Sequence, residues 1–177
     1  MKKTLIATGV SLALLSGFVA ADEAKTYVEV GYSVLGDSDS INGQAFDVDL
    51  GAGTLGLGYQ INDNFAVEGF VGTGLKDDSI TVSGINLDAE LKSIYGIYVK
   101  PSANLTDDVK IFAKVGYVSY ELEASVPALA FSESEDFDDF SYGVGAQFDI
   151  SDNTYISASY TAIDEVDGFG MALGFKF

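Results

Sequence analysis

The sequence ends in GFGMALGFKF (168–177), where large apolar side chains alternate with small or charged ones. The alternating large residues are Phe169, Met171, Leu173, Phe175 and Phe177. Successive side chains of a β-strand point to opposite faces, so a period of two predicts a strand with one apolar face and one glycine-rich face. Residues 138–150 repeat the pattern. Both stretches predict strands with one face toward an apolar environment and the other toward a narrow interior in which side chains are crowded.

The same alternation recurs in segments of about ten residues, separated by clusters of Asn, Asp, Ser and Gly. The segments cover roughly 26–35, 53–61, 64–75, 87–100, 109–122, 138–150, 154–163 and 167–177. Segments of this length and period are typical of strands that cross a lipid bilayer, and their even number allows the sheet to close with both ends on one side. The sequence therefore predicts an all-β fold, an eight-stranded antiparallel up-and-down transmembrane β-barrel.

The connections between these segments alternate in length. The short turns are 62–63, 101–108 and 151–153, and the longer, strongly acidic connections are 36–52, 76–86 and 123–137. Short turns are expected in the periplasm and long loops outside the cell, although the fourth outer connection, near Asp164, is also short. Residues 46–50 alternate as well, so the first hairpin is expected to extend beyond the membrane, with a bulge within 51–54.

The first 21 residues have the pattern of a signal peptide, with Lys2 and Lys3, an apolar stretch and a small-residue cleavage site before Asp22. Cleavage after Ala20 is the alternative. A membrane anchor is disfavoured because the apolar run is shorter than the roughly 20 residues that a spanning helix needs. Residues 22–177 then form one barrel domain.

Composition excludes several classes of function. The chain has 27 acidic and 9 basic residues and neither Cys nor His. Nucleic acid is not expected as a partner because phosphate binding requires clustered Lys and Arg. An enzyme is not expected either, since acid–base and nucleophilic sites commonly use His or Cys, and no cofactor or metal site is predicted. The acidic loops are interpreted as solvated, with divalent-cation binding left as an alternative.

A soluble β-sandwich or lipocalin-like barrel would also alternate, so periodicity alone leaves that alternative open. The membrane barrel is favoured because the face opposite the apolar one consists of glycine with isolated charges. On that interior face lie Glu29, Glu68, Glu90, Lys92, Lys100, Lys110, Lys114 and Lys176. A lysine facing lipid near the midplane would cost ~2–4 kcal/mol, so their shared phase predicts a paired charge network in the lumen. For Lys100 and Lys176, near strand ends, reaching the headgroups is the alternative.

Several short motifs, in this order and spacing, carry a resemblance that extends over nearly all of the mature chain. They are Leu57–Asn62 (LGYQIN), Phe65–Glu68 (FAVE), Ala113–Tyr117 (AKVGY), Tyr142–Gly145 (YGVG) and the terminal Phe177. They resemble the small eight-stranded outer-membrane barrels related to the OmpA transmembrane domain, OmpX and the opacity surface antigens. The resemblance implies that Leu173, Phe175 and Phe177 form the recognition signal for the barrel assembly machinery. The alternative is that these three side chains only face lipid, and the two interpretations are compatible.

OmpA-like barrels carry a lumen network of two acids and two bases that plugs or gates the interior. The resemblance assigns one acid to Glu68 and one base to Lys114, whereas Gln147 and Ser157 stand where the second acid and an arginine are expected. The predicted lumen network is therefore Glu29, Glu68, Glu90, Lys92, Lys110, Lys114 and Gln147.

These patterns together predict a monomer in the outer membrane with a side-chain-filled lumen and a structural or adhesive role. The expected partners are outer-membrane lipid, lipopolysaccharide and the barrel assembly machinery, with a host or cell-surface ligand as a further candidate. The apolar segment Val126–Phe131 in the third long loop either contacts such a surface or packs against the other loops. The alternative function is a narrow pore for ions or very small solutes.

Overall fold

The computed structural model describes residues 25–41, 44–82, 85–126, 131–164 and 166–177, and nearly all of them belong to strands. The strands are β1 (Thr26–Ile41), β2 (Gln44–Asn62), β3 (Phe65–Lys76), β4 (Asp78–Val82), β5 (Ile85–Asn104), β6 (Val109–Val126), β7 (Phe131–Ser151), β8 (Thr154–Ile163) and β9 (Val166–Lys176). β3 matches the third predicted strand, whereas β4, which continues it after an interruption at Asp77, lies in the connection predicted at 76–86; both pair with β5. The predicted all-β fold is confirmed.

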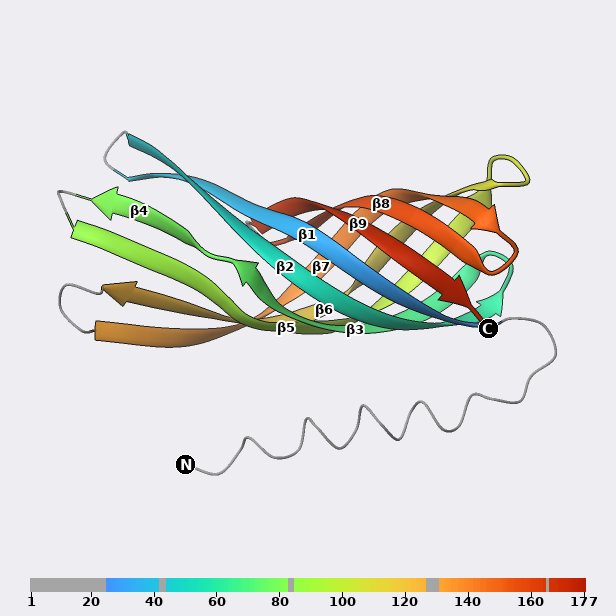
Figure 1. Cartoon of the computed structure of the whole chain (residues 1–177), viewed down its shortest axis with the longest axis horizontal. Helices are drawn as coiled ribbons and strands as arrows, with labels where there is room; N and C mark the ends of the chain where they lie inside the picture. Colours follow the sequence, from blue (N-terminus) through green and yellow to red (C-terminus); the bar gives the residue numbers. More distant parts are fainter. Residues whose placement is uncertain (1–24, 42–43, 83–84, 127–130, 165) are drawn as a thin grey trace, which may run out of the picture.

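Antiparallel pairing closes the sheet into a barrel of eight strands, with β4 as the continuation of β3. Except for β3 and β4, each strand pairs with the next in the sequence; β1 also pairs with β9, and β3 pairs with β5. Figure 1 shows the short turns and the C-terminus at one end of the barrel and three long hairpins at the other. The described residues contain no helix that is long and apolar enough to cross a membrane.

The apolar rows predicted from the sequence point away from the lumen in the middle of the barrel. On β9 the side chains of Phe169 and Met171 are 71% and 68% exposed, and on β7 that of Val144 is 61% exposed. Gly168 on β9 and Ser141 on β7 lie on the opposite, buried face. The outer surface is therefore apolar where a bilayer would surround it.

The long connections are hairpins rather than loops, which corrects the prediction for 36–52, 76–86 and 123–137. β1 and β2 pair up to Ile41 and Gln44, and β6 and β7 up to Val126 and Phe131. The antiparallel pairing of these strands continues beyond the membrane-spanning part of the barrel. The predicted extension of the first hairpin is confirmed, and the fourth connection is short as expected, closing at Ile163 and Val166.

Beyond the membrane the apolar side chains turn inward. The core of this part consists of Leu50, Ala52, Leu91, Ile94, Tyr98, Val118 and Ile163. Two register shifts accompany the change. The predicted bulge at 51–54 is found between Gly51 and Ala52, but the extra residue is Leu75 on β3 and the pairing of β2 with β1 is continuous. The second shift makes Lys92 the extra residue on β5.

A polar contact bridges β2 and β4 where β3 is interrupted. The backbone N–H groups of Asp49 and Ser79 donate to the two carboxylate oxygens of Asp78, at 2.9 and 2.8 Å. These hydrogen bonds hold the pKa of the exposed Asp78 carboxyl below its usual value. The Asp78 carboxylate therefore accepts the hydrogen bond from the Asp49 N–H that a backbone carbonyl of a paired strand would otherwise accept.

Aromatic rings explain why the interior face is rich in glycine. Five rings in the lumen lie against a glycine directly opposite on the neighbouring strand, in the space that a Cβ would occupy. The pairs are Tyr27 with Gly58, Phe70 with Gly96, Tyr98 with Gly116, Phe112 with Gly145 and Tyr155 with Gly174. Such rings shield the glycine backbone and fix the register of the strands. The crowded interior expected from the sequence is thus filled with rings laid across glycines.

Candidate functional site: a closed, charged lumen

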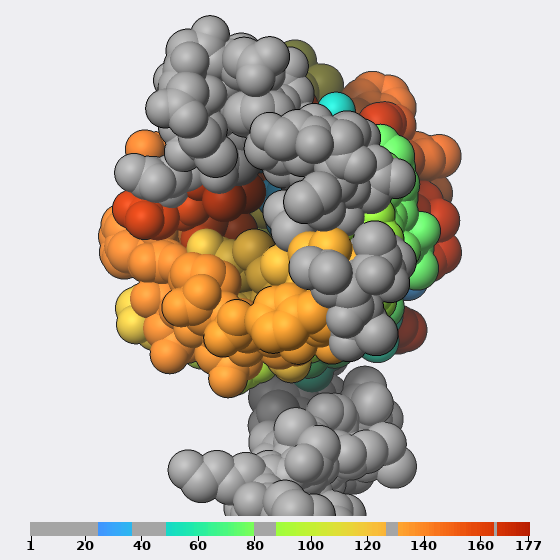
Figure 2. All heavy atoms as spheres, turned by 90° about the vertical axis from the view of Figure 1, so that its left-hand side faces the viewer, coloured from blue at the N-terminus to red at the C-terminus, as the bar shows by residue number. Residues whose placement is uncertain are grey.

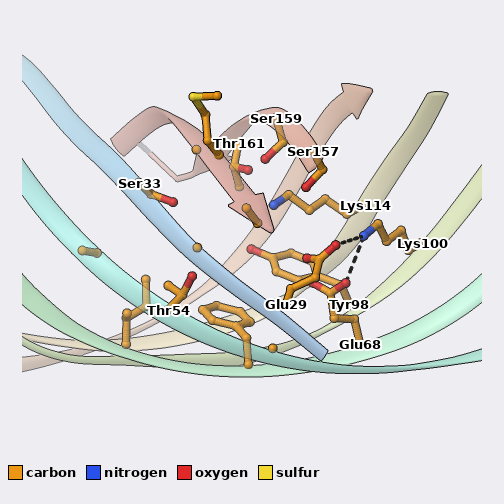
Figure 3. Close-up of a pocket in the computed structure, with 18 of the residues that line it drawn as sticks. Glu29, Ser33, Thr54, Glu68, Tyr98, Lys100, Lys114, Ser157, Ser159 and Thr161 are labelled. Atoms are coloured by element: carbon orange, nitrogen blue, oxygen red, sulfur yellow. Dashed lines mark hydrogen bonds and ion pairs between the residues drawn. The ribbon is translucent and has the colours of Figure 1, made fainter. Parts of the chain in front are cut away.

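Four charged side chains from four strands meet in the middle of the lumen: Glu29 of β1, Glu68 of β3, Lys100 of β5 and Lys114 of β6 (Figure 3). The ammonium of Lys100 lies 3.2 Å from a carboxylate oxygen of Glu29 and 3.1 Å from one of Glu68. The side chains of Lys100 and Glu68 are each 8% exposed. One lysine therefore joins two buried carboxylates across the barrel.

The strand order makes this meeting possible. β2 lies between β1 and β3, and its inward positions opposite Glu29 and Glu68 are Gly56 and Gly58. No large side chain of β2 stands between the two carboxylates, because the space beside Gly56 is open and that beside Gly58 holds the ring of Tyr27, which donates to Glu68. Lys100 reaches them from the far side of β3, where it pairs with Ala66, a small residue. Small residues thus create the space that the ions occupy.

Two tyrosines complete the hydrogen bonding of the carboxylates. The hydroxyl of Tyr27 donates to Glu68 and that of Tyr155 donates to Glu29, both at 2.8 Å. The Lys100 ammonium also lies 4.5 Å from the ring centre of Phe112 and 5.2 Å from that of Tyr27. Burying ions is costly unless each is paired and hydrogen-bonded, and these contacts offset that cost.

Lys114 faces a small cavity on the side of the network toward the hairpins. Its ammonium lies 5.2 Å from the ring centre of Tyr98, and in the described part of the chain no carboxylate is within ion-pair distance of it. The cavity has a volume of about 90 Å³, and the hydroxyls of Ser157, Ser159 and Thr161 line it beside Lys114 (Figure 3). A polar cavity of this size accommodates a few water molecules, which are suitable partners for the ammonium.

The lumen has three layers along its length. The ion network forms the middle layer. Toward the hairpins follows an apolar layer that includes Leu91, Ile94 and Val118, which are 2%, 5% and 0% exposed, and Ile94 also lines the cavity beside the network. Toward the short turns, Tyr27 and Tyr155 meet edge to face with ring centres 6.1 Å apart.

The layer near the short turns also contains polar residues around a cavity of about 20 Å³. Lys176 pairs with Asp149 at 2.8 Å, and the amide of Gln147 donates to the same carboxylate at 2.7 Å. Lys110 lines this cavity. Among the described residues it forms no ion pair within 4 Å. This layer is therefore separate from the Glu29–Lys100–Glu68 network.

The structure brings together only part of the predicted network. Glu29, Glu68 and Lys114 lie in the middle layer, and Lys110 and Gln147 lie in the layer near the short turns. Lys100 was recognised as an interior lysine but not included in the predicted network, although it joins both acids. Reaching the headgroups, the alternative for Lys100, is wrong because the residue is buried. Its position in the alternation of β5, on the inward side, is the sequence signal that indicates a place in the lumen network.

Glu90 and Lys92 do not belong to the lumen, which corrects the prediction for both. Lys92 pairs with Glu90 at 2.6 Å and with Glu123 at 3.2 Å, and all three are partly exposed. The cause is the bulge at Lys92, which reverses the alternation so that Leu91 is buried and Glu90 points to the opposite face. Glu90 is directly opposite Glu123, and Lys92 neutralises this like-charge pair.

A closed barrel with an apolar exterior and an ionic, ring-filled interior defines an integral outer-membrane protein. The chain belongs to the family described as the outer membrane protein beta-barrel domain, whose model matches residues 5–177. No curated protein sequence matches the chain. The predicted membership of the small outer-membrane barrels, and with it the outer-membrane location, is confirmed.

Solved structures of small bacterial barrels share the fold. Ail, the attachment invasion locus protein of Yersinia pestis, is 21% identical with a TM-score of 0.60, over 88% of this chain and 100% of Ail. OprG from Pseudomonas aeruginosa is 12% identical with a TM-score of 0.63, over 89% and 98%. Neisserial surface protein A is 15% identical with a TM-score of 0.58, over 86% and 97%. At such identities the likeness shows the fold alone.

Proposed function

We propose that this chain is a sealed barrel that holds acidic hairpins outside the outer membrane and acts through surface contact rather than transport. The observation that carries the proposal is the layered lumen. Any ion passing through would have to cross the apolar layer of Leu91, Ile94 and Val118 and then the Lys100 network. A dry apolar constriction is a barrier to ions because it cannot replace their hydration.

A narrow pore remains the second candidate function, and the two cavities support it. Both are lined in part by Lys100 and Phe112, so these two side chains separate one cavity from the other. If they moved together, the two spaces would merge into a longer path through the barrel. The pore hypothesis therefore requires the ion network to break.

Electrical recording separates these functions. We expect purified, refolded protein in planar bilayers to show no stable openings in 1 M KCl. Substituting Ile94→Ser and Val118→Ser in one variant should increase the frequency of brief openings, because hydroxyls allow water into the apolar layer. Substituting Val144→Ser, on the outer face, serves as the matched control with no expected effect. Steady openings of the unmodified protein would support the pore and contradict the sealed barrel.

The charge of the hairpins favours a cationic partner. Most carboxylates of the β6–β7 hairpin are not neutralised by a residue that the structure describes, since the ion pairs of Lys92 there are with Glu90 and Glu123. Ail of Yersinia pestis was solved in complex with the heparin analogue sucrose octasulfate, which is a polyanion. This chain has a formal charge of −18 and would repel such a ligand. Its ligand, if it acts by contact, is better sought among cationic proteins or peptides.

Binding by whole cells tests this contact role. We expect cells that display the barrel to be retained on a surface coated with a cationic protein more than cells without it, and less so as salt increases. Neutralising Glu135→Gln, Asp136→Asn and Asp138→Asn together should reduce retention severalfold. Equal retention by both kinds of cell at low salt would argue against a role in contact.

Three further parts of the proposal rest on the sequence and the resemblance. Residues 1–21 are proposed to be a signal peptide and lie outside the described residues. The assembly signal is proposed to be Leu173, Phe175 and Phe177, whose outward, exposed positions leave them accessible to another protein. The barrel is proposed to be a monomer in contact with lipopolysaccharide, without a catalytic activity or cofactor.

A further inference from the structure

In the part of the chain that the structure describes, one edge of β7 has no strand beside it over its outer half. From Phe131 to Phe140 this strand pairs with β6 on one side, whereas pairing with β8 on the other side ends at Ser141 and Ile163. β8 and β9 then turn back at Ile163 and Val166. Figure 1 shows the hairpin of β6 and β7 projecting well past the turn between β8 and β9. Ten residues of regular strand therefore present one free backbone edge.

This edge is protected against pairing with another strand by acidic charge alone. Natural edges are blunted by charged side chains, above all lysine, or by proline, a bulge or a covering segment, and here acidic side chains are the protection that is present. Residues 131–140 contain neither Lys nor Pro, and their pairing with β6 is continuous, without a register shift. Among the described residues, one side chain contacts the backbone of this segment: the Tyr117 hydroxyl donates to the Asp138 carbonyl, at 3.4 Å. The edge is thus straight and available for hydrogen bonding.

Charge determines what can pair with it. Five carboxylates lie within the ten residues, namely Glu133, Glu135, Asp136, Asp138 and Asp139. None of these five forms an ion pair with a residue that the structure describes. The exposed end of the barrel in Figure 2 has this strand, drawn in orange, on its rim. A second copy of the chain would place the same carboxylates against them, so self-pairing is opposed by like-charge repulsion.

We infer that the free edge of β7 between Phe131 and Phe140 binds an extended cationic peptide segment by adding it as a further strand. Backbone hydrogen bonds supply affinity in this mode, and side chains at alternate positions supply specificity. The partner carries Lys or Arg at every second residue, so that its charges lie on one face of the strand, beside either Glu133, Glu135 and Asp139 or Asp136 and Asp138. This inference rests on the proposed contact function and defines the partner and the way it binds.

Three peptides of equal charge test the mode of binding. Each is a capped decapeptide of alternating Lys and Thr: one unmodified, one N-methylated at every second residue, and one N-methylated throughout. A strand has two edges, and alternate methylation blocks only one. We expect the first two to bind the folded, detergent-solubilised barrel within about threefold of each other, and the fully methylated peptide to bind at least about tenfold more weakly, because several backbone hydrogen bonds are lost.

Amide hydrogen exchange locates the contact. Binding of the unmodified peptide should slow exchange at alternate residues of 131–140. Substituting Glu135→Gln, Asp136→Asn and Asp138→Asn should weaken binding about tenfold or more. The control is Asp63→Asn, Asp107→Asn and Asp108→Asn, which removes the same charge from exposed positions in the turns at the other end of the barrel. This variant should bind nearly as well as the unmodified protein.

The outcomes distinguish this inference from the proposed function. Equal binding of all three peptides would show attraction by charge alone, which overturns strand addition while leaving a cationic contact partner in place. Exchange protection elsewhere than 131–140 would also overturn it. Absence of binding by any of the peptides, together with no retention of whole cells on a cationic surface, would contradict both the inference and the contact function.

Discussion

Replacing Lys100 with Met lowers the free energy of unfolding by about 3–5 kcal/mol, because Glu29 and Glu68 then remain buried without a cation between them. The lysine makes contacts of 3.2 and 3.1 Å to these two carboxylates, and its side chain is as buried as that of Glu68. The measurement is urea unfolding of the refolded barrel in micelles. Tyrosine fluorescence can follow it because the chain has no tryptophan.

Two variants make this result specific to the ion network. Lys110→Met removes a lysine from the layer near the short turns and should change the free energy of unfolding by less than about 1 kcal/mol, as expected for a lysine without an ion pair. Adding Glu29→Gln and Glu68→Gln to Lys100→Met should restore part of the lost stability, since no buried carboxylate remains without a cation and Lys114 is the one charge left in the cluster. If Lys100→Met were as stable as the unmodified protein, Lys100 would not hold the network together.

Gly58→Ala produces the second large effect, a loss of about 3 kcal/mol or more. A Cβ at Gly58 would enter the ring of Tyr27, which lies directly opposite on β1. Displacing the ring costs about 1–3 kcal/mol for overpacking, and breaking its hydrogen bond to the Glu68 carboxylate costs about 1.5–3 kcal/mol. Unfolding in urea and the fraction of protein that refolds both report this change.

The matched control lies two residues away on the same inward face of β2. A Cβ at Gly56 would lie 3.6 Å from the nearest side-chain atom, which is an ordinary contact. Gly56→Ala should therefore change the stability by less than about 1 kcal/mol. Similar losses for the two alanine variants would show that the effect comes from the loss of glycine in the strand and not from the ring of Tyr27.

The barrel itself could be predicted from the sequence because lipid imposes a strict period on each strand. Side chains that face the bilayer are apolar, so each spanning strand shows an apolar residue at every second position. The outward rows and the number of strands can therefore be predicted from the sequence. Phe169 and Met171 on β9 are examples, and both are outward and exposed in the structure. The phase of Glu29, Glu68 and Lys100 followed from the same rule.

The details that escaped prediction depend on pairing between strands. A bulge changes which face a residue occupies, and nothing in the sequence around Lys92 marks the inserted residue, so Glu90 and Lys92 were misplaced. The strands beyond the membrane were not predicted because these segments are long and strongly acidic, which is also typical of extracellular loops. The partners of Lys100 depend on which strands are neighbours and on the glycines of β2 between the two acids.

The reversal of the apolar faces also defines how thick a membrane the barrel fits. On β7 the outward apolar row runs from Phe140 to Ile150, after which the strand ends. Ten residue steps along a strand tilted by about 40° rise roughly 25 Å, which is the height of the apolar band in outer-membrane barrels. A thicker bilayer would submerge the acidic base of the hairpins in hydrocarbon. Hydrophobic mismatch would therefore sort this chain into thin membranes, and short-chain lipids suit its reconstitution.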